Sequence, residues 1–191
     1  MILEIVQYGN PVLREKGREV KDVSEKVKRL AEDMLETMRS ANGVGLAAQQ
    51  VGVPLQMTVI DVADIEDRPS AMFIGDDEVK IEDYMPLVLL NPQLKLSKDK
   101  EVGSEGCLSF PEMSADITRA AGVRCKAQRL DGTEIEFDAS GLLARALQHE
   151  VDHLHGILFI DRMSAADKAD LKAELEELQT ATKAGLAKKK K

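Results

Sequence analysis

The sequence predicts an α+β fold in which mainly antiparallel sheets pack around one central helix, with an N-terminal and a C-terminal helix beside them. Two observations support this prediction. Helical periodicity occurs in three separate stretches, and the strand-like runs at 57–62, 87–96 and 123–137 cluster between the first and the second of these stretches. The strands do not alternate regularly with helices, which favours antiparallel pairing over a parallel βαβ sheet.

Length and composition narrow the class of protein. The 191 residues fit one domain, which we expect to span residues 1–185, and the terminal lysines predict a flexible basic tail over residues 186–191. The formal net charge of -8 argues against a general nucleic-acid or membrane-surface binder and favours a small or peptidic ligand. The chain has neither a signal-like opening nor an apolar run of the roughly 18 residues that a membrane span needs, so we expect a soluble, cytoplasmic protein.

The first and last helices are each predicted from an N-cap and an apolar stripe. Ser24 caps the first helix, whose stripe consists of Val27, Leu30, Ala31, Met34, Leu35 and Met38. Ser164 and Asp167 form a capping box that begins the last helix, expected over about 164–184. Its inward-facing residues are predicted to be Leu171, Leu175 and Leu178.

The region between these helices contains an acidic stretch and a hairpin. Residues 64–85 are rich in Asp and Glu, and we expect them to form a surface excursion. Apolar and polar residues alternate on both sides of Asp131 and Gly132, which predicts a β-hairpin that turns at this dipeptide.

The central helix is predicted to start at Asp138 or Ser140 and to end at Gly156. It carries the H-E-x-x-H motif, formed by His149, Glu150, Val151, Asp152 and His153. Two imidazoles four residues apart project from one helical face toward a shared ion, and the glutamate one step round reaches a metal-activated water. The motif therefore predicts a metal site with a general base beside it.

A catalytic metal site of this kind needs three protein ligands and one open position, so the third ligand must come from another part of the chain. Cys107 is one candidate, because two cysteines do not make a disulfide framework and a divalent cation would hold a thiol as thiolate. Glu174 on the last helix is the other candidate, although its charged neighbours favour a solvated position. Sequence context favours Cys107.

Other residues near these motifs are assigned more ordinary positions. His155 is rotated by roughly 200° from His153 on a helix, which places it at a rim away from the metal face. Cys125 lies within an alternating strand and is expected to be buried packing. The small residues of 43–50 fit two interpretations, a close-packed structural segment or a surface against which a substrate backbone lies with a glutamine amide as oxyanion donor.

Three segments together resemble the signature motifs of the peptide deformylase family, in its order and spacing. They are Gly43-Val44-Gly45-Leu46-Ala47-Ala48-Gln49-Gln50, Glu105-Gly106-Cys107-Leu108-Ser109 and Gln148-His149-Glu150-Val151-Asp152-His153. The similarity begins in 5–14 and extends to about Arg162. The family removes the N-formyl group from the initiator methionine of nascent proteins and releases formate, so the resemblance implies this amide hydrolysis and a peptide deformylase-like fold. It also selects Cys107 over Glu174.

The resemblance implies a role for each residue that matches a motif. The implied metal ligands are Cys107, His149 and His153. Glu150 would take a proton from the attacking water and return it to the leaving amine. The Gln50 amide and the Leu108 backbone N–H would bind the oxyanion of the tetrahedral intermediate, where loss of one such donor costs about 10² to 10³ in rate.

The implied substrate-binding residues are Val44, Gly45, Gly106, Phe110, Leu142 and Ala146. Leu142 and Ala146 share the histidine face of the central helix and would offer an apolar, roomy surface to an unbranched methionine side chain. The backbones of Val44 and Gly106 would pair with the substrate in strand fashion. Arg145 departs from the apolar residue expected at the edge of this pocket, and the acidic stretch is longer than expected for the family.

The donor set suits zinc, iron, cobalt or nickel. The resemblance implies one ferrous ion per chain, for which zinc, nickel or cobalt would substitute. It also implies N-formylmethionyl nascent peptides as partners, and docking on the ribosome through the C-terminal helix and the lysine tail. Glu105 or Arg119 would orient the ligands, or would form an ordinary ion pair.

Two other classes of function compete with this interpretation. A zinc endopeptidase would use His149, His153 and Glu174 and would not need Cys107. A non-enzymatic domain with a structural metal would need a fourth protein ligand, for which the sequence offers no clear candidate.

Overall fold

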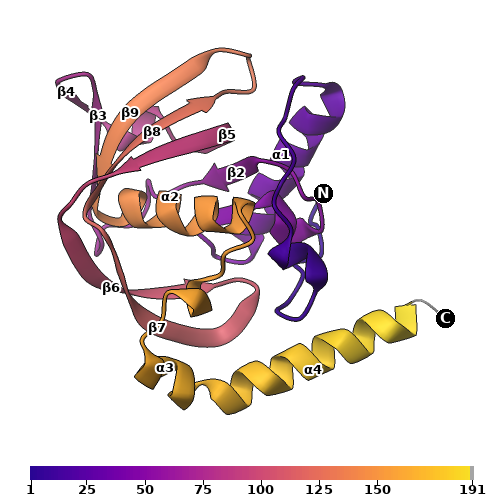
Figure 1. Ribbon diagram of the computed structural model, residues 1–191. Helices are drawn as coiled ribbons and strands as arrows, with labels where there is room; N and C mark the ends of the chain where they lie inside the picture. Colours follow the sequence, from indigo (N-terminus) through magenta and orange to yellow (C-terminus); the bar gives the residue numbers. More distant parts are fainter. Residues whose placement is uncertain (190–191) are drawn as a thin grey trace.

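In the computed structural model, which describes residues 1–189, helix α2 (Gly141–Leu154) runs between a seven-stranded sheet and a separate two-stranded hairpin (Figure 1). The large sheet has the strand order β1-β2-β5-β8-β9-β3-β4, and the hairpin consists of β6 and β7. Neighbouring strands in both sheets pair antiparallel. The predicted α+β fold around a central helix is therefore confirmed.

The strands of the large sheet are β1 (Gly45–Ala47), β2 (Met57–Ile60), β3 (Ser70–Ile74), β4 (Asp77–Val79), β5 (Leu87–Leu96), β8 (Gly122–Gln128) and β9 (Glu134–Ser140). Those of the hairpin sheet are β6 (Lys100–Cys107) and β7 (Phe110–Ala120). The predicted strand at 87–96 is confirmed, and the one predicted at 57–62 is present but ends at Ile60. The turn between β8 and β9 is confirmed as well, and Gly132 adopts a positive φ of 84° there.

The acidic stretch at 64–85 is more than a surface excursion, and this prediction was wrong. It contains β3 and β4, and β3 pairs with β9 so that the hairpin extends the large sheet. Met72 of β3 is 0% exposed and belongs to the core between the sheet and α2. The acidic side chains lie at the exposed positions, and the short apolar run between them was too brief to indicate a strand.

Helix α1 (Glu25–Ser40) begins as predicted, with the Ser24 side chain accepting a hydrogen bond from the Val27 N–H. Its apolar stripe packs on β1 and β2 in a second core cluster, and Met34 and Met38 are fully buried there. Four short 3-10 helices connect the larger elements in the described part of the chain: η1 (Pro11–Arg14), η2 (Ala48–Val51), η3 (Ile81–Asp83) and η4 (Phe159–Asp161).

The C-terminal helical region differs from its predicted bounds. Ser164 caps α3 (Ala165–Asp170), and the helical conformation is interrupted at Leu171 before α4 (Lys172–Lys189) begins. The helix thus extends past residue 184, and residues 186–189 of the predicted flexible tail are helical. The last two residues of that tail lie outside the described range. Figure 1 shows α4 passing below the β6–β7 hairpin and continuing beyond it.

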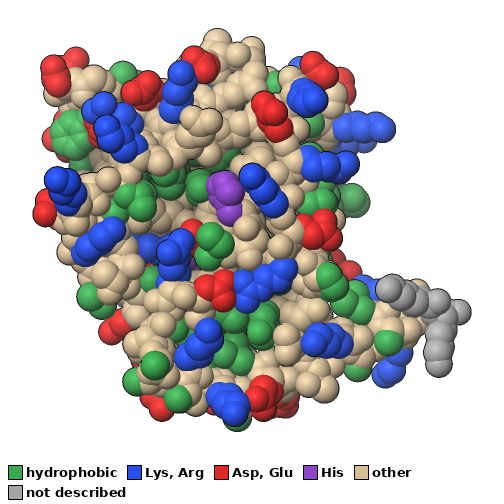
Figure 2. All heavy atoms as spheres, viewed as in Figure 1, with side chains coloured by type: hydrophobic (Ala, Val, Ile, Leu, Met, Phe, Trp, Pro, Cys, Tyr) green, Lys and Arg blue, Asp and Glu red, His purple; other side chains and the backbone are tan. Residues whose placement is uncertain are grey.

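The surface carries charges of both signs. Figure 2 shows Lys and Arg side chains interspersed with Asp and Glu side chains over the face in view, with no continuous basic area on that face. Within residues 1–189, no helix is both long enough and apolar enough to cross a membrane.

Candidate metal centre and catalytic cavity

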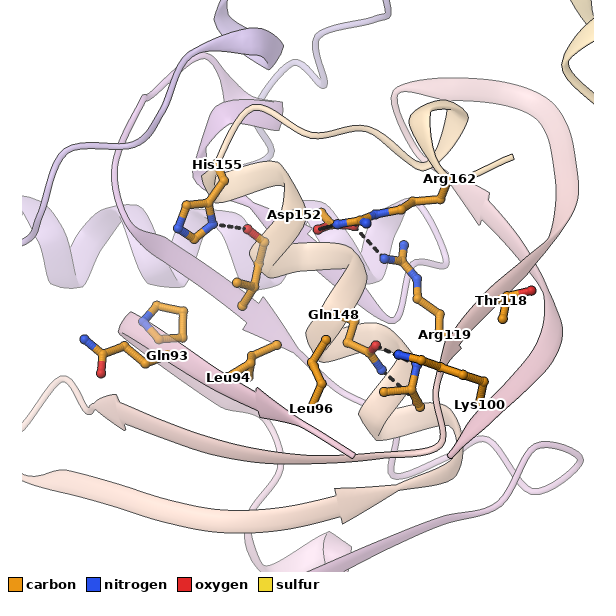
Figure 3. Close-up of a pocket in the computed structure, with 13 residues that line it drawn as sticks. Gln93, Leu94, Leu96, Lys100, Thr118, Arg119, Gln148, Asp152, His155 and Arg162 are labelled. Atoms are coloured by element: carbon orange, nitrogen blue, oxygen red, sulfur yellow. Dashed lines mark hydrogen bonds and ion pairs between the residues drawn. The ribbon is translucent and has the colours of Figure 1, made fainter. Parts of the chain in front are cut away.

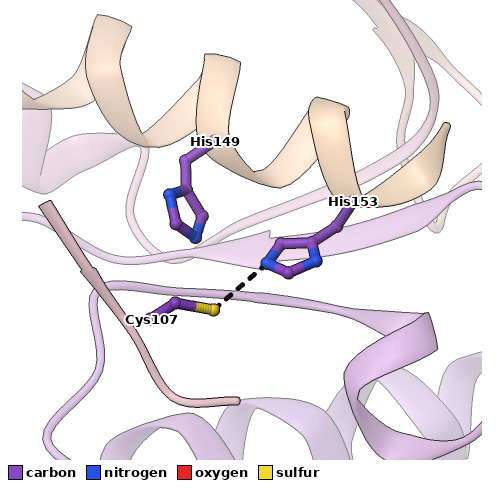
Figure 4. A group of neighbouring side chains, drawn as sticks. All are labelled: Cys107, His149 and His153. Atoms are coloured by element: carbon purple, nitrogen blue, oxygen red, sulfur yellow. Dashed lines mark hydrogen bonds between the residues drawn. The ribbon is translucent and has the colours of Figure 1, made fainter. Parts of the chain in front are cut away.

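Three potential metal donors converge between the hairpin and α2 (Figure 4). Cys107 is the last residue of β6, and His149 and His153 lie one turn apart on α2. Their donor atoms all lie within 4.8 Å of one another, and Cys107 Sγ is 3.3 Å from His153 Nε2. One thiol and two imidazoles with room for a fourth ligand are a donor set suited to a catalytic zinc or iron ion. Glu174 is exposed on α4 and takes no part in this group.

A carboxylate orients the first imidazole. The Nδ1 of His149 lies 2.8 Å from Glu105 Oε1, which leaves its Nε2 free to face the donor cluster. Arg119 donates to both oxygens of Glu105, each at 2.9 Å. Burial opposes the charge on Glu105, but the hydrogen bonds from Arg119 and His149 outweigh it and hold the pKa of this carboxyl well below its usual range. The carboxylate therefore acts as a permanent acceptor beside His149.

Glu150 lies one step round the helix with its carboxyl group buried. Its Oε2 has no hydrogen-bond partner among the described residues. Burial raises the pKa of Glu150 to about 7, with the positive charge of His149 opposing the shift. A Cβ on Gly45 would lie only 2.5 Å from Glu150 Oε1, so the backbone of β1 and the carboxyl group are in close contact. A carboxyl group of this kind exchanges protons near neutral pH.

The Gln50 side chain has a fixed orientation. Its Oε1 accepts a hydrogen bond from the Ala47 N–H at 2.9 Å, so its NH₂ group must point the other way. That group lies 3.5 Å from Cys107 Sγ and 3.3 Å from Ser109 Oγ. An amide donor is thus held beside the thiol, at the wall of the donor cluster.

A cavity of about 460 Å³ opens onto this cluster. It is lined by every residue predicted for the site except His153: Val44, Gly45, Gln50, Gly106, Cys107, Leu108, Phe110, Leu142, Ala146, His149 and Glu150. Arg68, Met113 and Arg145 also line it and were not predicted as site residues. Arg68 lies in the loop before β3 and Met113 lies on β7, and neither belongs to one of the three motifs.

His155 and Cys125 lie where the sequence predicted. His155 is exposed, its Nδ1 bonds to the Val151 carbonyl, and it lines a different cavity of about 410 Å³ (Figure 3). Cys125 is fully buried in β8, and burial raises the pKa of its thiol to about 12. Neither residue belongs to the donor cluster.

Comparison with known proteins agrees with this geometry. The family model for polypeptide deformylase matches residues 2–169. The chain belongs to the polypeptide deformylase family. It is 48% identical over 179 residues to a peptide deformylase of Methylacidiphilum infernorum, with 94% of each chain covered.

Solved deformylase structures are similar as well. The crystal structure of the enzyme from Thermotoga maritima matches with a TM-score of 0.71 and 37% identity, over 86% of this chain and 99% of that one. Peptide deformylase 1B of Arabidopsis thaliana, solved with an inhibitor, matches with a TM-score of 0.82 and 33% identity, over 96% and 93%.

Membership of the deformylase family defines the reaction. The protein is a metal-dependent hydrolase of carbon–nitrogen amide bonds that removes the formyl group from the N-terminal formylmethionine of nascent proteins. The endopeptidase and structural-metal alternatives are thereby set aside.

Proposed function

We propose that Cys107, His149 and His153 hold the catalytic metal ion of this deformylase and that Glu150 is its general acid and base. The observation that carries the proposal is the convergence of these three donors within 4.8 Å, at the wall of a cavity lined by Glu150. The thiol and imidazole donors fit a divalent metal ion. The Oε2 of Glu150 has no hydrogen-bond partner among the described residues, which fits a carboxylate that accepts a proton from the attacking water. When bound, the metal supplies Lewis-acid activation of water and of the formyl carbonyl.

Residues of the chain carry out proton transfer and bind the oxyanion. Glu150, with its pKa near 7, accepts the proton from the attacking water and delivers it to the departing amine. Gln50 presents its fixed NH₂ group to the developing oxyanion, together with the backbone N–H of Leu108. The products are formate and a free N-terminal methionine.

Recognition of methionine is assigned to the apolar part of the cavity. Leu142 and Ala146 line it from α2, and Phe110 and Val44 line it from β7 and from the segment before β1. Gly106 lines the cavity next to Cys107, where its missing side chain leaves room for a substrate backbone to pair in strand fashion with Gly106 and Val44. Gly45 leaves space for the Glu150 carboxyl group.

We further propose ferrous iron as the native metal and a cytoplasmic location in which the enzyme acts on chains at the ribosome. Thiolate and imidazole ligands suit iron as well as zinc, nickel or cobalt. Metal analysis of protein purified without oxygen tests the metal, with iron expected to exceed zinc. Helix α4, whose last described residue Lys189 is followed in the sequence by two further lysines, is the proposed docking element. Co-sedimentation of ribosomes with intact and α4-shortened protein tests this proposal.

The decisive experiment measures formate release from a formyl-Met-Ala-Ser peptide by anaerobically prepared, iron-loaded protein. Cys107→Ala and Glu150→Gln should each lose activity by about 10² or more, since one removes a metal ligand and the other the proton carrier. Glu174→Gln is the matched control and should keep wild-type activity. Retained activity in Cys107→Ala, or loss in Glu174→Gln, would overturn the assignment.

A further inference from the structure

The metal donors belong to two parts of the fold that share no backbone ladder. The histidines lie on α2, which packs against the seven-stranded sheet, whereas Cys107 ends a strand of the separate hairpin sheet. The turn after Cys107 is tied to the N-terminal segment, where the Tyr8 N–H donates to the Ser109 carbonyl at 2.9 Å. The distance between the thiol and the imidazoles therefore depends on this contact and on side chains that cross from α2 to the hairpin.

Among the α2 side chains of the described residues, Arg145 makes the most hydrogen bonds to the hairpin. It comes from α2, is only 4% exposed, and donates to backbone carbonyls of both hairpin strands. Its hydrogen bonds reach Ile117 O at 2.7 Å, Glu101 O at 3.1 Å and Gly103 O at 3.4 Å. It also donates to Glu105 Oε2 at 2.9 Å, the carboxylate that holds His149. One guanidinium thus joins β6, β7 and the Glu105 carboxylate to the helix.

Gly103 provides the space for this guanidinium. A Cβ at position 103 would lie 2.9 Å from Arg145 Cζ and 3.0 Å from Nε. Since real Cβ contacts are essentially never under 3.0 Å, a side chain at this position would require the guanidinium or β6 to shift. The position of the Arg145 guanidinium therefore depends on the absence of a side chain at Gly103.

The open end of the hairpin, where β6 begins and β7 ends, has a second set of contacts with α2 and the segment after it. Gln148 of α2 pairs with both the N–H and the carbonyl of Ala120, at 3.0 Å and 2.9 Å (Figure 3). Arg119 donates to Asp152 at 2.5 Å, and Arg162 donates to the same carboxylate. With these contacts in place, loss of the Arg145 contact would loosen the part of β6 from Glu101 to Glu105, which leads directly to Cys107, without detaching the hairpin.

We propose that Arg145, seated on Gly103, is a positioning residue that sets the place of Cys107 relative to His149 and His153. This inference rests on the proposed assignment of those three residues as metal ligands. Arg145 touches neither the donor cluster nor the reacting atoms in this role. It acts through the hairpin backbone and through Glu105, and so determines how tightly the site retains its metal.

The test uses cobalt-loaded full-length protein, because a cobalt–thiolate absorption band reports on the Cys107 bond independently of activity. Arg145→Leu and Gly103→Ala should each weaken that band and should lower metal affinity, measured by competition with a chelator, by about 10- to 100-fold. Two controls change the same residue types on β8. Arg124→Leu removes an exposed arginine–carboxylate pair, and Gly122→Ala adds a methyl whose nearest contact is 3.6 Å. Both should retain metal like wild type.

A double-mutant cycle separates positioning from general destabilisation. If the methyl of Gly103→Ala acts only by displacing the guanidinium, adding it to Arg145→Leu should change metal affinity by less than about twofold. Additive effects, or folded variants that hold cobalt like wild type, would overturn the proposal. If Arg145→Leu does not fold, the cobalt band and the metal affinity of Gly103→Ala alone test the proposal. A Cys107→Ala protein that keeps the cobalt band would instead refute the ligand assignment, which distinguishes the two failures.

Discussion

At the scale of single residues, the site depends on where side chains are missing as much as on where they are present. Gly45 lies against the Glu150 carboxyl group, and Gly103 lies against the Arg145 guanidinium. In both places the backbone approaches a buried charged group more closely than any Cβ would allow. The motif around Gly45 suggested either tight packing or substrate contact, and the structure shows that close packing against the proposed base is part of its role.

Gly45→Ala tests this close contact. The new methyl would lie 2.5 Å from Glu150 Oε1 and would push the carboxyl group out of place, so kcat should fall by about 10²-fold. Formate-release kinetics and a thermal melt measure activity and folding together. Gly122→Ala, where the nearest atom is 3.6 Å away, should leave kcat unchanged. Wild-type kcat in a folded Gly45→Ala protein would show that the carboxyl group tolerates the shift.

The Cys125 thiol should be unreactive in the folded protein. It is 0% exposed and its pKa is raised by burial to about 12, so almost no thiolate forms at pH 8. In a Cys107→Ala background, where Cys125 is the remaining thiol, mass spectrometry after iodoacetamide treatment should show rapid labelling in urea and little in buffer. Equal labelling rates in both conditions would contradict the burial of this residue.

At the scale of elements, helix α4 buries few of its side chains against the rest of the protein. Leu175 is its one buried side chain in the described range, and it joins Leu13, Phe110 and Phe159 in a third core cluster. Phe110 also lines the catalytic cavity. The remainder of α4 is largely exposed, which explains why its pattern predicted a helix but not how far the helix extends.

Leu175→Ala should lower the free energy of unfolding by about 2 to 4 kcal/mol, because it leaves a cavity in this third cluster. Urea denaturation followed by circular dichroism measures the change. Leu186→Ala is the matched control on the same helix, since Leu186 lies outside the core clusters and should cost less than about 1 kcal/mol. Equal effects of the two substitutions would mean that α4 is held along its whole length.

At the scale of the whole molecule, segments far apart in sequence close around the catalytic helix. Arg14 of η1 forms a two-bond ion pair with Asp161 of η4, and the Gly17 N–H donates to the Leu154 carbonyl at the end of α2 at 2.9 Å. Burial opposes ionisation of Asp161, but hydrogen bonds from Arg14 and from the Leu158 N–H lower its pKa below the ordinary value of 3.8. This contact joins the beginning of the domain to the segment after α2.

Asp161→Asn should reveal the pH dependence of that closure. Because the folded-state pKa is depressed, the ion pair stabilises the protein above pH 3.8 and its contribution is lost as the pH falls through the lower folded-state pKa. The variant should therefore be less stable than wild type at pH 7, by about 0.5 to 1 kcal/mol, and should approach it in acid. Urea titrations at several pH values measure the difference. A gap that does not narrow in acid would refute this account.

Features that depend on neighbouring residues were determined by the sequence alone. The N-caps at Ser24 and Ser164, the β8–β9 hairpin and the helical H-E-x-x-H motif all follow from spacings of a few residues, and the structure confirms them. The resemblance to deformylases also identified many of the residues that line the cavity, and family membership is confirmed by the comparisons.

Only the tertiary structure decided what distant segments do together. It brought Cys107 to the two histidines, placed β3 of the acidic stretch beside β9, and broke the last helix at Leu171. It also gave the unexpected Arg145 four partners on a hairpin some 28 to 44 positions away. A guanidinium on an apolar helix face is unfavourable by local pattern, and it becomes favourable only because folding supplies acceptors that no short stretch of sequence contains.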